Sequence, residues 1–117
     1  MLVIEDNDIF RDALELLFAL RDDVELVASL GDGSEAVGVC ARLGPDVAVV
    51  DYRLPGLDGV EVAAAIRFAC PDVAVVCLTA EADEPALEAF RELGVAEFVT
   101  KDEPFEDIVA AIRRAAA

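Results

Sequence analysis

Two stretches of the sequence, residues 47–50 and 73–78, are apolar at every position. A strand with one face in water alternates apolar and polar residues, so an unbroken apolar strand is expected to be buried on both faces. Strands of this kind are typical of parallel sheets, because their helical connections cover both sides of the sheet. The pattern therefore predicts an α/β fold organised around a parallel sheet.

Short apolar segments alternate with amphipathic ones along the rest of the chain. Further strands are predicted at residues 1–4, 24–29 and 96–100, and each of the five strands is followed by a helical pattern. No linker or internal repeat interrupts this order, so residues 1–117 are predicted to form a single domain. The expected architecture is the flavodoxin-like (βα)5 fold, an open parallel five-stranded sheet in the order 2-1-3-4-5 with helices on both faces.

Glycine, proline and apolar periodicity define the predicted helices. The boundary signals are Gly33 or Ser34 at the start of the second helix, Gly44-Pro45 at its end, Gly59 and Ala69 as the approximate limits of the third, Pro85 in the first turn of the fourth and Pro104 at the start of the last. The expected apolar faces are Ile9, Ala13, Leu16, Leu17 and Leu20 in the first helix, Leu87, Phe90 and Leu93 in the fourth, and Phe105, Ile108, Val109 and Ile112 in the last.

The chain is strongly acidic, with 25 Asp and Glu against 9 Lys and Arg and a net charge of -16. Nucleic-acid phosphates would be repelled, so direct binding of nucleic acid by this domain is not expected. A divalent cation or a basic protein surface is a better match. The chain also contains no histidine, which excludes Ser-His and Cys-His catalysis and removes the most common general base.

The cysteines and the ends of the chain indicate a cytoplasmic protein. Cys40, Cys70 and Cys77 are odd in number and lack C-x-x-C spacing, so we interpret them as small buried apolar residues in a reducing compartment. No apolar run approaches the ~18 residues that a membrane span needs. The sequence enters its first strand at Met1 without a basic leader region, so no secretory signal is predicted.

Polar and charged residues follow four of the predicted strands. Glu5-Asp6 follows the first strand, Asp51 the third, Thr79 the fourth and Lys101 the fifth. Ligands of open α/β sheets bind beyond the carboxyl ends of the strands, so these side chains are expected to converge. Each has an ordinary alternative explanation as a helix cap, a turn residue or a surface residue. Their coincidence at one edge is harder to explain in that way.

Three carboxylates placed together repel each other unless protons or a cation neutralise them. Oxygen ligands in this arrangement suit Mg²⁺, which bridges carboxylates and phosphate. Lys101 is the only lysine in a chain whose other eight basic residues are arginines. Its compact ammonium on a flexible stem could reach a phosphoryl oxygen.

Taken in order, these residues resemble the receiver domain of bacterial two-component response regulators, over essentially the whole chain. The matching blocks are Glu5-Asp6, the run Asp51-x-x-Leu54-Pro55-Gly56-x-Asp58-Gly59, Thr79-Ala80, and Lys101 three residues after Phe98. The run Asp51-Tyr52-Arg53-Leu54-Pro55 and the Lys101-Asp102 pair are similar to the NarL/FixJ-type subfamily.

The resemblance implies that Asp51 accepts a phosphoryl group from a phosphohistidine. Mg²⁺ would be held by Asp6, Asp51 and the backbone carbonyl of Arg53, with Glu5 acting through a bound water. The metal ion and a nearby ammonium would offset charge on the transferring group, which is most of the catalysis that such chemistry needs.

The resemblance also implies a switch. Lys101, Thr79 and the backbone of Ala80 would contact the phosphoryl oxygens, and Phe98 would turn inward as Thr79 moves toward the phosphate. Phosphorylation would then favour a second conformation of the face formed by the fourth helix, the fifth strand and the fifth helix. A packed strand aromatic is the ordinary alternative for Phe98.

The partners implied are a sensor histidine kinase or a phosphotransfer protein, a helix-turn-helix output domain outside this chain, and a second copy of the domain. The output would be transcription regulated through a phosphorelay. The protein would not be an enzyme in the ordinary sense, since it would catalyse only its own phosphotransfer and slow autodephosphorylation. The resemblance implies no association with a membrane.

Three residues depart from the most common pattern of the family. Asp102 follows Lys101 where many receivers have proline, so a cis peptide is not assumed there. The acidic pair is Glu-Asp, whose longer first side chain could alter the water shell of the metal ion. The switch residue is Phe98, which has no hydroxyl.

Three other functions are compatible with this architecture. A degenerate receiver would act only by binding proteins, but the site residues are complete. A flavodoxin-like cofactor binder would need a Ser, Thr and Gly phosphate loop where this chain has the acidic run that starts at Glu5. An aspartyl hydrolase would need a second acid or base and a cap over the site, and neither is evident in the sequence.

Overall fold

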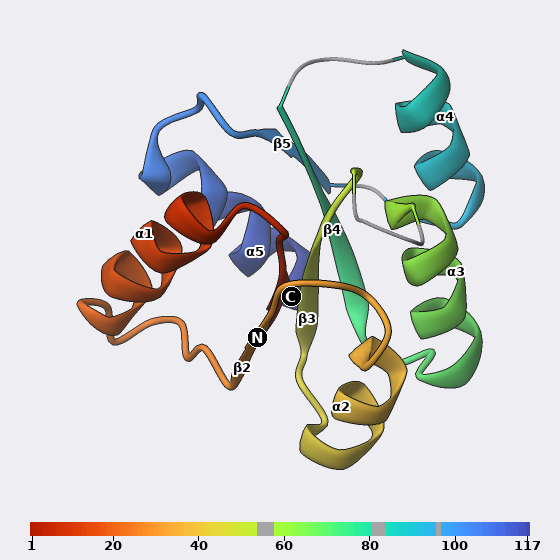
Figure 1. Ribbon diagram of the computed structural model, residues 1–117, viewed down its shortest axis with the longest axis horizontal. Coiled ribbons are helices and arrows are strands. Elements are labelled where there is room, and N and C mark those ends of the chain that lie inside the picture. The colour runs from red at the N-terminus through yellow and green to blue at the C-terminus, as the bar shows by residue number, and fades with distance from the viewer. Residues whose placement is uncertain (54–57, 81–83, 96) are drawn as a thin grey trace.

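The structure of the protein, a computed structural model, describes residues 1–53, 58–80, 84–95 and 97–117. Strands and helices alternate through the whole chain (Figure 1). They are β1 (Leu2–Ile4), α1 (Asp8–Ala19), β2 (Ala28–Leu30), α2 (Ala36–Leu43), β3 (Val47–Asp51), α3 (Gly59–Ala69), β4 (Ala74–Thr79), α4 (Glu84–Glu92), β5 (Glu97–Thr100) and α5 (Phe105–Ala116).

The five strands form one parallel sheet in the order β2-β1-β3-β4-β5. Helices α1 and α5 lie on one face of this sheet, and α2, α3 and α4 lie on the other (Figure 1). The predicted fold class and strand order are therefore confirmed. In such a sheet the carboxyl ends of all strands meet at one edge, which is where the candidate site is expected.

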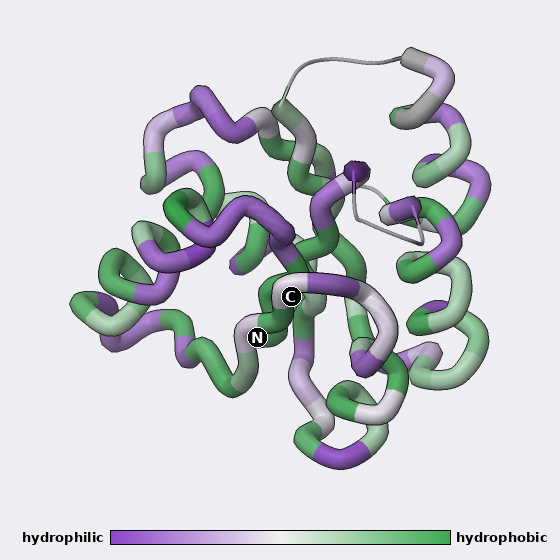
Figure 2. The backbone as a smooth tube through the Cα atoms, in the orientation of Figure 1, coloured by the Kyte–Doolittle hydropathy of each residue, from purple (hydrophilic) through white to green (hydrophobic). Residues whose placement is uncertain are grey.

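The central strands are buried on both faces, as their unbroken apolar sequences predict. Ala48 and Val50 pack into a core with α2, α3 and α4, whereas Val47 and Val49 pack into a second core with α1 and α5. The hydropathy colouring shows the apolar strands inside and the hydrophilic segments mainly at the periphery (Figure 2). The two cores leave the sheet with no water-exposed face along β3.

The predicted second strand, residues 24–29, is wrong in its extent, because β2 contains only Ala28–Leu30. Leu2, the first residue of β1, pairs with Ala28. In a parallel pair, residues 24–27 therefore lie beyond the first residue of β1. They have no partner strand there. The chain start instead holds them through the Met1 ammonium, which donates to the carbonyl of Glu25 at 2.8 Å.

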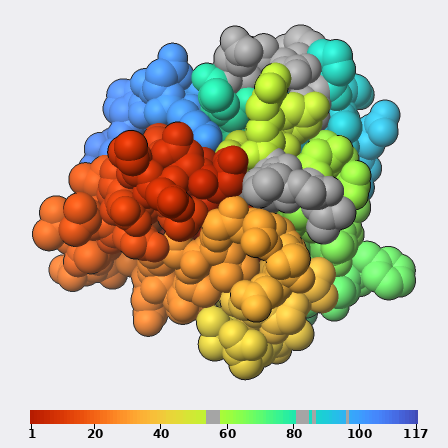
Figure 3. All heavy atoms as spheres, viewed as in Figure 1, coloured from red at the N-terminus to blue at the C-terminus, as the bar shows by residue number. Residues whose placement is uncertain are grey.

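The predicted core face of α1 is also wrong. Ile9, Leu16 and Leu20 are 84%, 71% and 83% exposed, and the residues that α1 buries are Leu14 and Phe18. Helix α1 carries two apolar stripes, and the stripe that contains the aromatic residues packs inward, where the Phe18 and Phe105 rings lie 5.0 Å apart. The other stripe faces outward, and in the space-filling view no other element covers α1 (Figure 3).

Local capping explains the remaining boundaries. The side chain of Asn7, rather than that of Asp6 or Asp8, caps α1 by accepting from the backbone N–H of Phe10 at 3.0 Å. Helix α2 begins at Ala36, after the predicted Gly33 or Ser34, and ends at Gly44 with φ 57°, a left-handed conformation that favours glycine.

The other elements follow their predictions closely. Helix α3 has the predicted limits, β4 is shifted by one residue, and α5 begins immediately after Pro104. The predicted core residues of α4 and α5 are buried or partly buried. Within the described part of the chain, no helix is both long and apolar enough to cross a membrane.

Candidate functional site

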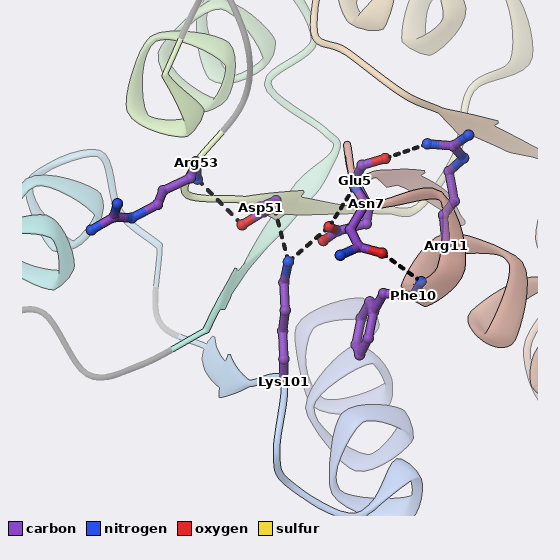
Figure 4. Close-up of polar contacts among 7 residues, drawn as sticks. All are labelled: Glu5, Asn7, Phe10, Arg11, Asp51, Arg53 and Lys101. Carbon is purple, nitrogen blue, oxygen red and sulfur yellow. Dashed lines mark hydrogen bonds and ion pairs between the residues drawn. The ribbon is translucent and has the colours of Figure 1, made fainter.

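The side chains at the carboxyl ends of β1, β3 and β5 meet at one edge of the sheet (Figure 4). The Lys101 ammonium donates to Oε1 of Glu5 at 2.7 Å and to Oδ2 of Asp51 at 3.1 Å. Both carboxylates are almost fully buried, whereas the Lys101 side chain is 20% exposed. The structure thus brings together three residues that the sequence places at separate strand ends.

Glu5 is fully buried, which is unusual for a carboxylate. Its backbone N–H donates to the carbonyl of Leu30 at 2.9 Å, and its Oε1 accepts from the backbone N–H of Asn7 at 3.0 Å. Its second oxygen, Oε2, has no hydrogen-bond partner among the described residues. A buried oxygen of this kind is costly unless a proton, water or cation satisfies it.

Asp51 ends β3 and is 3% exposed. Its Oδ1 accepts from the backbone N–H of Arg53 at 3.2 Å. Burial, together with the charge of Glu5, raises the pKa of Asp51 to about 7, although hydrogen bonds from Lys101 and Arg53 oppose the shift. The ionised form of Asp51 is therefore electrostatically strained in the absence of a further cation.

The Lys101 ammonium remains protonated in this environment. Burial lowers the pKa of Lys101, but the hydrogen bonds with Glu5 and Asp51 outweigh it and leave the pKa above its ordinary value. Among the described residues, the Lys101 ammonium contacts Glu5 and Asp51, and Asp6 adds a third carboxylate to the cluster. The charge of Lys101 alone cannot neutralise them.

Oxygen atoms of Glu5, Asp6 and Asp51 all lie within 4.8 Å of one another. Asp6 is exposed, so the cluster opens to water on its side. Hard oxygen ligands, surplus negative charge, an unpartnered buried oxygen on Glu5 and an open side are the features that Mg²⁺ requires, because this ion keeps several of its waters. The residues present therefore fit a magnesium ion.

Thr79 and Ala80 lie at the end of β4, next to the same edge. Thr79 is 6% exposed, and its backbone carbonyl accepts from the backbone N–H of Lys101 at 2.8 Å. This bond fixes the start of the β5–α5 loop beside β4. The structure therefore places the predicted hydroxyl and ammonium on adjacent strand ends.

The predicted switch residue, Phe98, lies in β5 opposite Cys77 of β4. Its ring is partly buried against the core under α2, α3 and α4. The guanidinium of Arg91, in the last turn of α4, lies over this ring at 5.3 Å from its centroid. Phe98 thus connects α4 with β5.

Other residues support the site without a prediction from the sequence. Arg11 donates to the carbonyl of Glu5 at 2.6 Å and to Oδ1 of Asp8 at 2.7 Å, which anchors the acidic loop to α1. Phe10 lies beside Lys101 (Figure 4). The Asp8–Arg11 pair has the i,i+3 spacing of a helical ion pair, which is a signal that the sequence contains. The contact between Phe10 and Lys101 depends on tertiary placement, and no local sequence pattern indicates it.

Gly59 begins α3 and packs directly against the chain that carries Asp51. A Cβ atom at Gly59 would lie 2.2 Å from the Asp51 carbonyl oxygen and 2.7 Å from the Tyr52 Cα. The Gly59 N–H also donates to the Tyr52 carbonyl at 2.7 Å. The glycine in the Asp58-Gly59 pair thus permits this close contact. The motif residues Leu54-Pro55-Gly56 lie outside the described residues.

Comparisons with known proteins agree with this geometry. The family model described as the response regulator receiver domain matches residues 1–113. The probable transcriptional regulatory protein NarL of Mycobacterium tuberculosis is 36% identical over 92% of this chain and 50% of its own length. The transcriptional regulatory protein LnrK of Bacillus subtilis is 31% identical over 96% of this chain and 51% of its own length. The chain thus spans about half the length of the curated relatives that it matches.

Solved structures show the same similarity. The signal receiver domain of the response regulator NarL from Mycobacterium tuberculosis superposes with a TM-score of 0.90 and 32% identity, covering 98% of this chain and 93% of that one. A DNA-binding response regulator of the LuxR family from Staphylococcus aureus gives a TM-score of 0.89 and 28% identity. The match covers 99% of this chain and 98% of that one.

Proposed function

Because the chain belongs to the response regulator receiver domain family, we propose that it is a phosphorylation-dependent switch whose phosphoryl acceptor is Asp51. The observation that carries this assignment is the buried Asp51 carboxylate, which clusters with the acidic residues that follow β1 and accepts from the Lys101 ammonium. A carboxylate held there is aimed at the open edge of the sheet, where a phosphate donor can approach. The role of each site residue follows from its position.

In the proposed reaction, an ionised Asp51 oxygen attacks the phosphorus of a phosphohistidine. An oxygen–phosphorus bond forms, the nitrogen–phosphorus bond breaks, and the electron pair leaves with the imidazole. Glu5, Asp6, Asp51 and the backbone carbonyl of Arg53 would hold Mg²⁺, which when bound neutralises negative charge at the reacting oxygens.

The remaining residues would bind the product. The Lys101 ammonium would exchange Asp51 for a phosphoryl oxygen, and the Thr79 hydroxyl and the backbone N–H of Ala80 would donate to the other oxygens. The phosphoryl group adds between about 1.5 and 2 negative charges and three strong acceptors, so it favours the conformation in which these donors converge.

The switch would reach the face formed by α4, β5 and α5. Movement of Thr79 toward the phosphate makes room for Phe98, which now lies under Arg91 of α4. Inward rotation of Phe98 would change that contact and with it the surface of α4 and β5. This face would transmit the signal to an output domain or to a second copy of the protein.

A sensor histidine kinase or phosphotransfer protein would supply the phosphoryl group. The exposed apolar face of α1 starts at Ile9, beside the acidic loop, and continues through Leu16 to Leu20. Contiguous exposed apolar surface marks interaction sites, so we assign this face to the donor protein. The relatives are about twice as long and are named as transcriptional regulators, which supports a cytoplasmic role in transcription through a DNA-binding output domain.

The test is incubation with acetyl phosphate and Mg²⁺ followed by intact-mass spectrometry. The expected result is one phosphoryl adduct that requires Mg²⁺ and is absent from Asp51→Asn. The matched control is Asp12→Asn, which removes an exposed acid of α1 outside the cluster and should still be labelled. An unlabelled wild type in the presence of Mg²⁺, or a labelled Asp51→Asn variant, would refute the assignment.

A further inference from the structure

We propose that Phe10 is a positioning residue for phosphoryl transfer, because its ring holds the Lys101 ammonium in place while the ammonium exchanges its other partners. The inference rests on the proposed function of Asp51 and adds a residue to that site. The carrying observation is that Nζ of Lys101 lies over the Phe10 ring, 5.2 Å from its centroid (Figure 4). A cation within about 6 Å of a ring centroid is attracted by the negative face of the ring.

The Phe10 ring is held in place by its surroundings. Phe10 lies in the first turn of α1, where its backbone N–H donates to the side chain of Asn7 at 3.0 Å. Its ring is partly buried and packs against the core that α1 and α5 share with the sheet. The ring is therefore a fixed surface rather than a mobile neighbour of the ammonium.

Lys101 needs such a surface because its stem is long and flexible. In the structure, the ammonium contacts Glu5, Asp51 and the Phe10 ring. The two carboxylates are also the groups that would bind Mg²⁺ and carry the phosphoryl group, so their bonds to Lys101 must weaken or rearrange as the reaction proceeds.

The contact with the ring does not compete with the reaction. It is an attraction between a charge and a quadrupole, and it does not require an N–H of the ammonium to point at a lone pair. The N–H groups released by Glu5 and Asp51 can then turn toward phosphoryl oxygens while the ring keeps the nitrogen at the site. Phe10 would thus stabilise Lys101 before and after transfer, without touching the reacting atoms.

The test uses Phe10→Leu, which keeps an apolar side chain but removes the ring, and Phe10→Tyr, which keeps the ring. Phe18→Leu is the matched control, because it removes a more deeply buried ring from the same helix and core. Since Lys101 is the only lysine, protein labelled with ¹³C-lysine gives a single set of lysine signals. The two measurements are the ring-current shift of the Lys101 ε-protons and the rate of labelling by acetyl phosphate at saturating Mg²⁺.

In Phe10→Leu, we expect loss of the upfield shift of the ε-protons and a fall of about two- to tenfold in the labelling rate. Phe10→Tyr should retain both, and Phe18→Leu should retain both in spite of a lower melting temperature. Unchanged ε-proton shifts or an unchanged rate in Phe10→Leu would overturn the inference, and so would an equal fall in Phe18→Leu. An unlabelled wild type would instead refute the function of Asp51, while the ε-proton shift would still decide whether the ring holds Lys101.

Discussion

The ammonium of Lys101 lies 2.7 Å from Oε1 of Glu5, although the two residues are 96 positions apart in the chain. Glu5 follows β1 and Lys101 follows β5, so the contact reaches across β3 and β4, which separate those strands in the sheet. A fully buried carboxylate is thereby paired with a cation from the far edge.

Replacing Lys101 with methionine should destabilise the fold at neutral pH without Mg²⁺. The substitution keeps most of the stem but leaves Glu5 and Asp51 buried without their cation, which is expected to cost about 2–4 kcal/mol of unfolding free energy. Urea denaturation provides the measurement. Arg114→Met, which breaks an exposed ion pair with Glu97, is the control and should cost less than about 1 kcal/mol. Equal losses in the two variants would contradict the importance of the buried pair.

The pH dependence of stability should carry the signature of Asp51. Its pKa is raised from 3.8 in the unfolded chain to about 7 in the folded protein, so the folded state binds this proton more tightly. The contribution of this proton to the free energy of unfolding is fully present below about pH 4 and is lost as the pH rises through about 7. Asp51→Asn should therefore be more stable than the wild type at pH 8, by about 1–3 kcal/mol, and nearly equal to it at pH 4. A difference that does not vary with pH would contradict this.

Magnesium should stabilise the protein by relieving repulsion among Glu5, Asp6 and Asp51. At a Mg²⁺ concentration ten times its Kd, the gain should be about 1.4 kcal/mol, seen as a higher melting temperature in thermal denaturation. Asp6→Asn should reduce the gain, whereas Asp12→Asn, outside the cluster, should show the same gain as the wild type. A melting temperature that millimolar Mg²⁺ leaves unchanged would argue against a metal site here.

Gly59→Ala should lower the stability of the fold, whereas Gly38→Ala should raise it. The Cβ of Gly59→Ala would overlap backbone atoms of Asp51 and Tyr52, so we expect a loss of about 2–4 kcal/mol or a displaced β3–α3 loop. Apart from the neighbouring backbone of α2, no atom of the described residues lies within 4 Å of the position that a Cβ atom would take at Gly38, so Gly38→Ala should stabilise by about 0.5–1 kcal/mol. Urea denaturation measures the free energy of unfolding of both variants. A similar change in the two would contradict the prediction.

Thr79→Ala should separate phosphorylation from switching. The variant keeps Asp51 and the acidic cluster, so acetyl phosphate should still label it. Without the hydroxyl, residue 79 cannot donate to the phosphoryl group, so its movement would no longer make room for Phe98. The amide NMR signals of α4 and β5 should therefore shift less on phosphorylation than in the wild type. Wild-type shifts in labelled Thr79→Ala would remove Thr79 from the switch.

The sequence was sufficient for the architecture and for the edge at which the site lies. The unbroken apolar runs at residues 47–50 and 73–78 required burial on both faces, and β3 and β4 are buried in that way. Since parallel strands end at one edge, the residues after each strand had to meet. The proximity of Glu5, Asp51 and Lys101 could thus be predicted before any distance was known.

The second strand and the orientation of α1 could not be predicted in the same way. The length of β2 depends on where β1 begins, because residues before Ala28 have no partner strand. The sequence of α1 contains two apolar stripes, and periodicity ranks neither above the other. Packing against α5 and the sheet buries Leu14 and Phe18 and leaves the Ile9 stripe in water.

By itself the sequence determined a parallel α/β sheet with acids, a hydroxyl and one ammonium at its carboxyl edge, because strand polarity and side-chain chemistry are local properties of the chain. Only the tertiary structure decided which α1 stripe is buried, which oxygen of Glu5 lacks a hydrogen-bond partner among the described residues, and that the Phe10 ring lies under Lys101. These features depend on how segments distant in sequence pack together. The rotation of α1 against the sheet decides which of its stripes is buried, and no local pattern encodes that rotation.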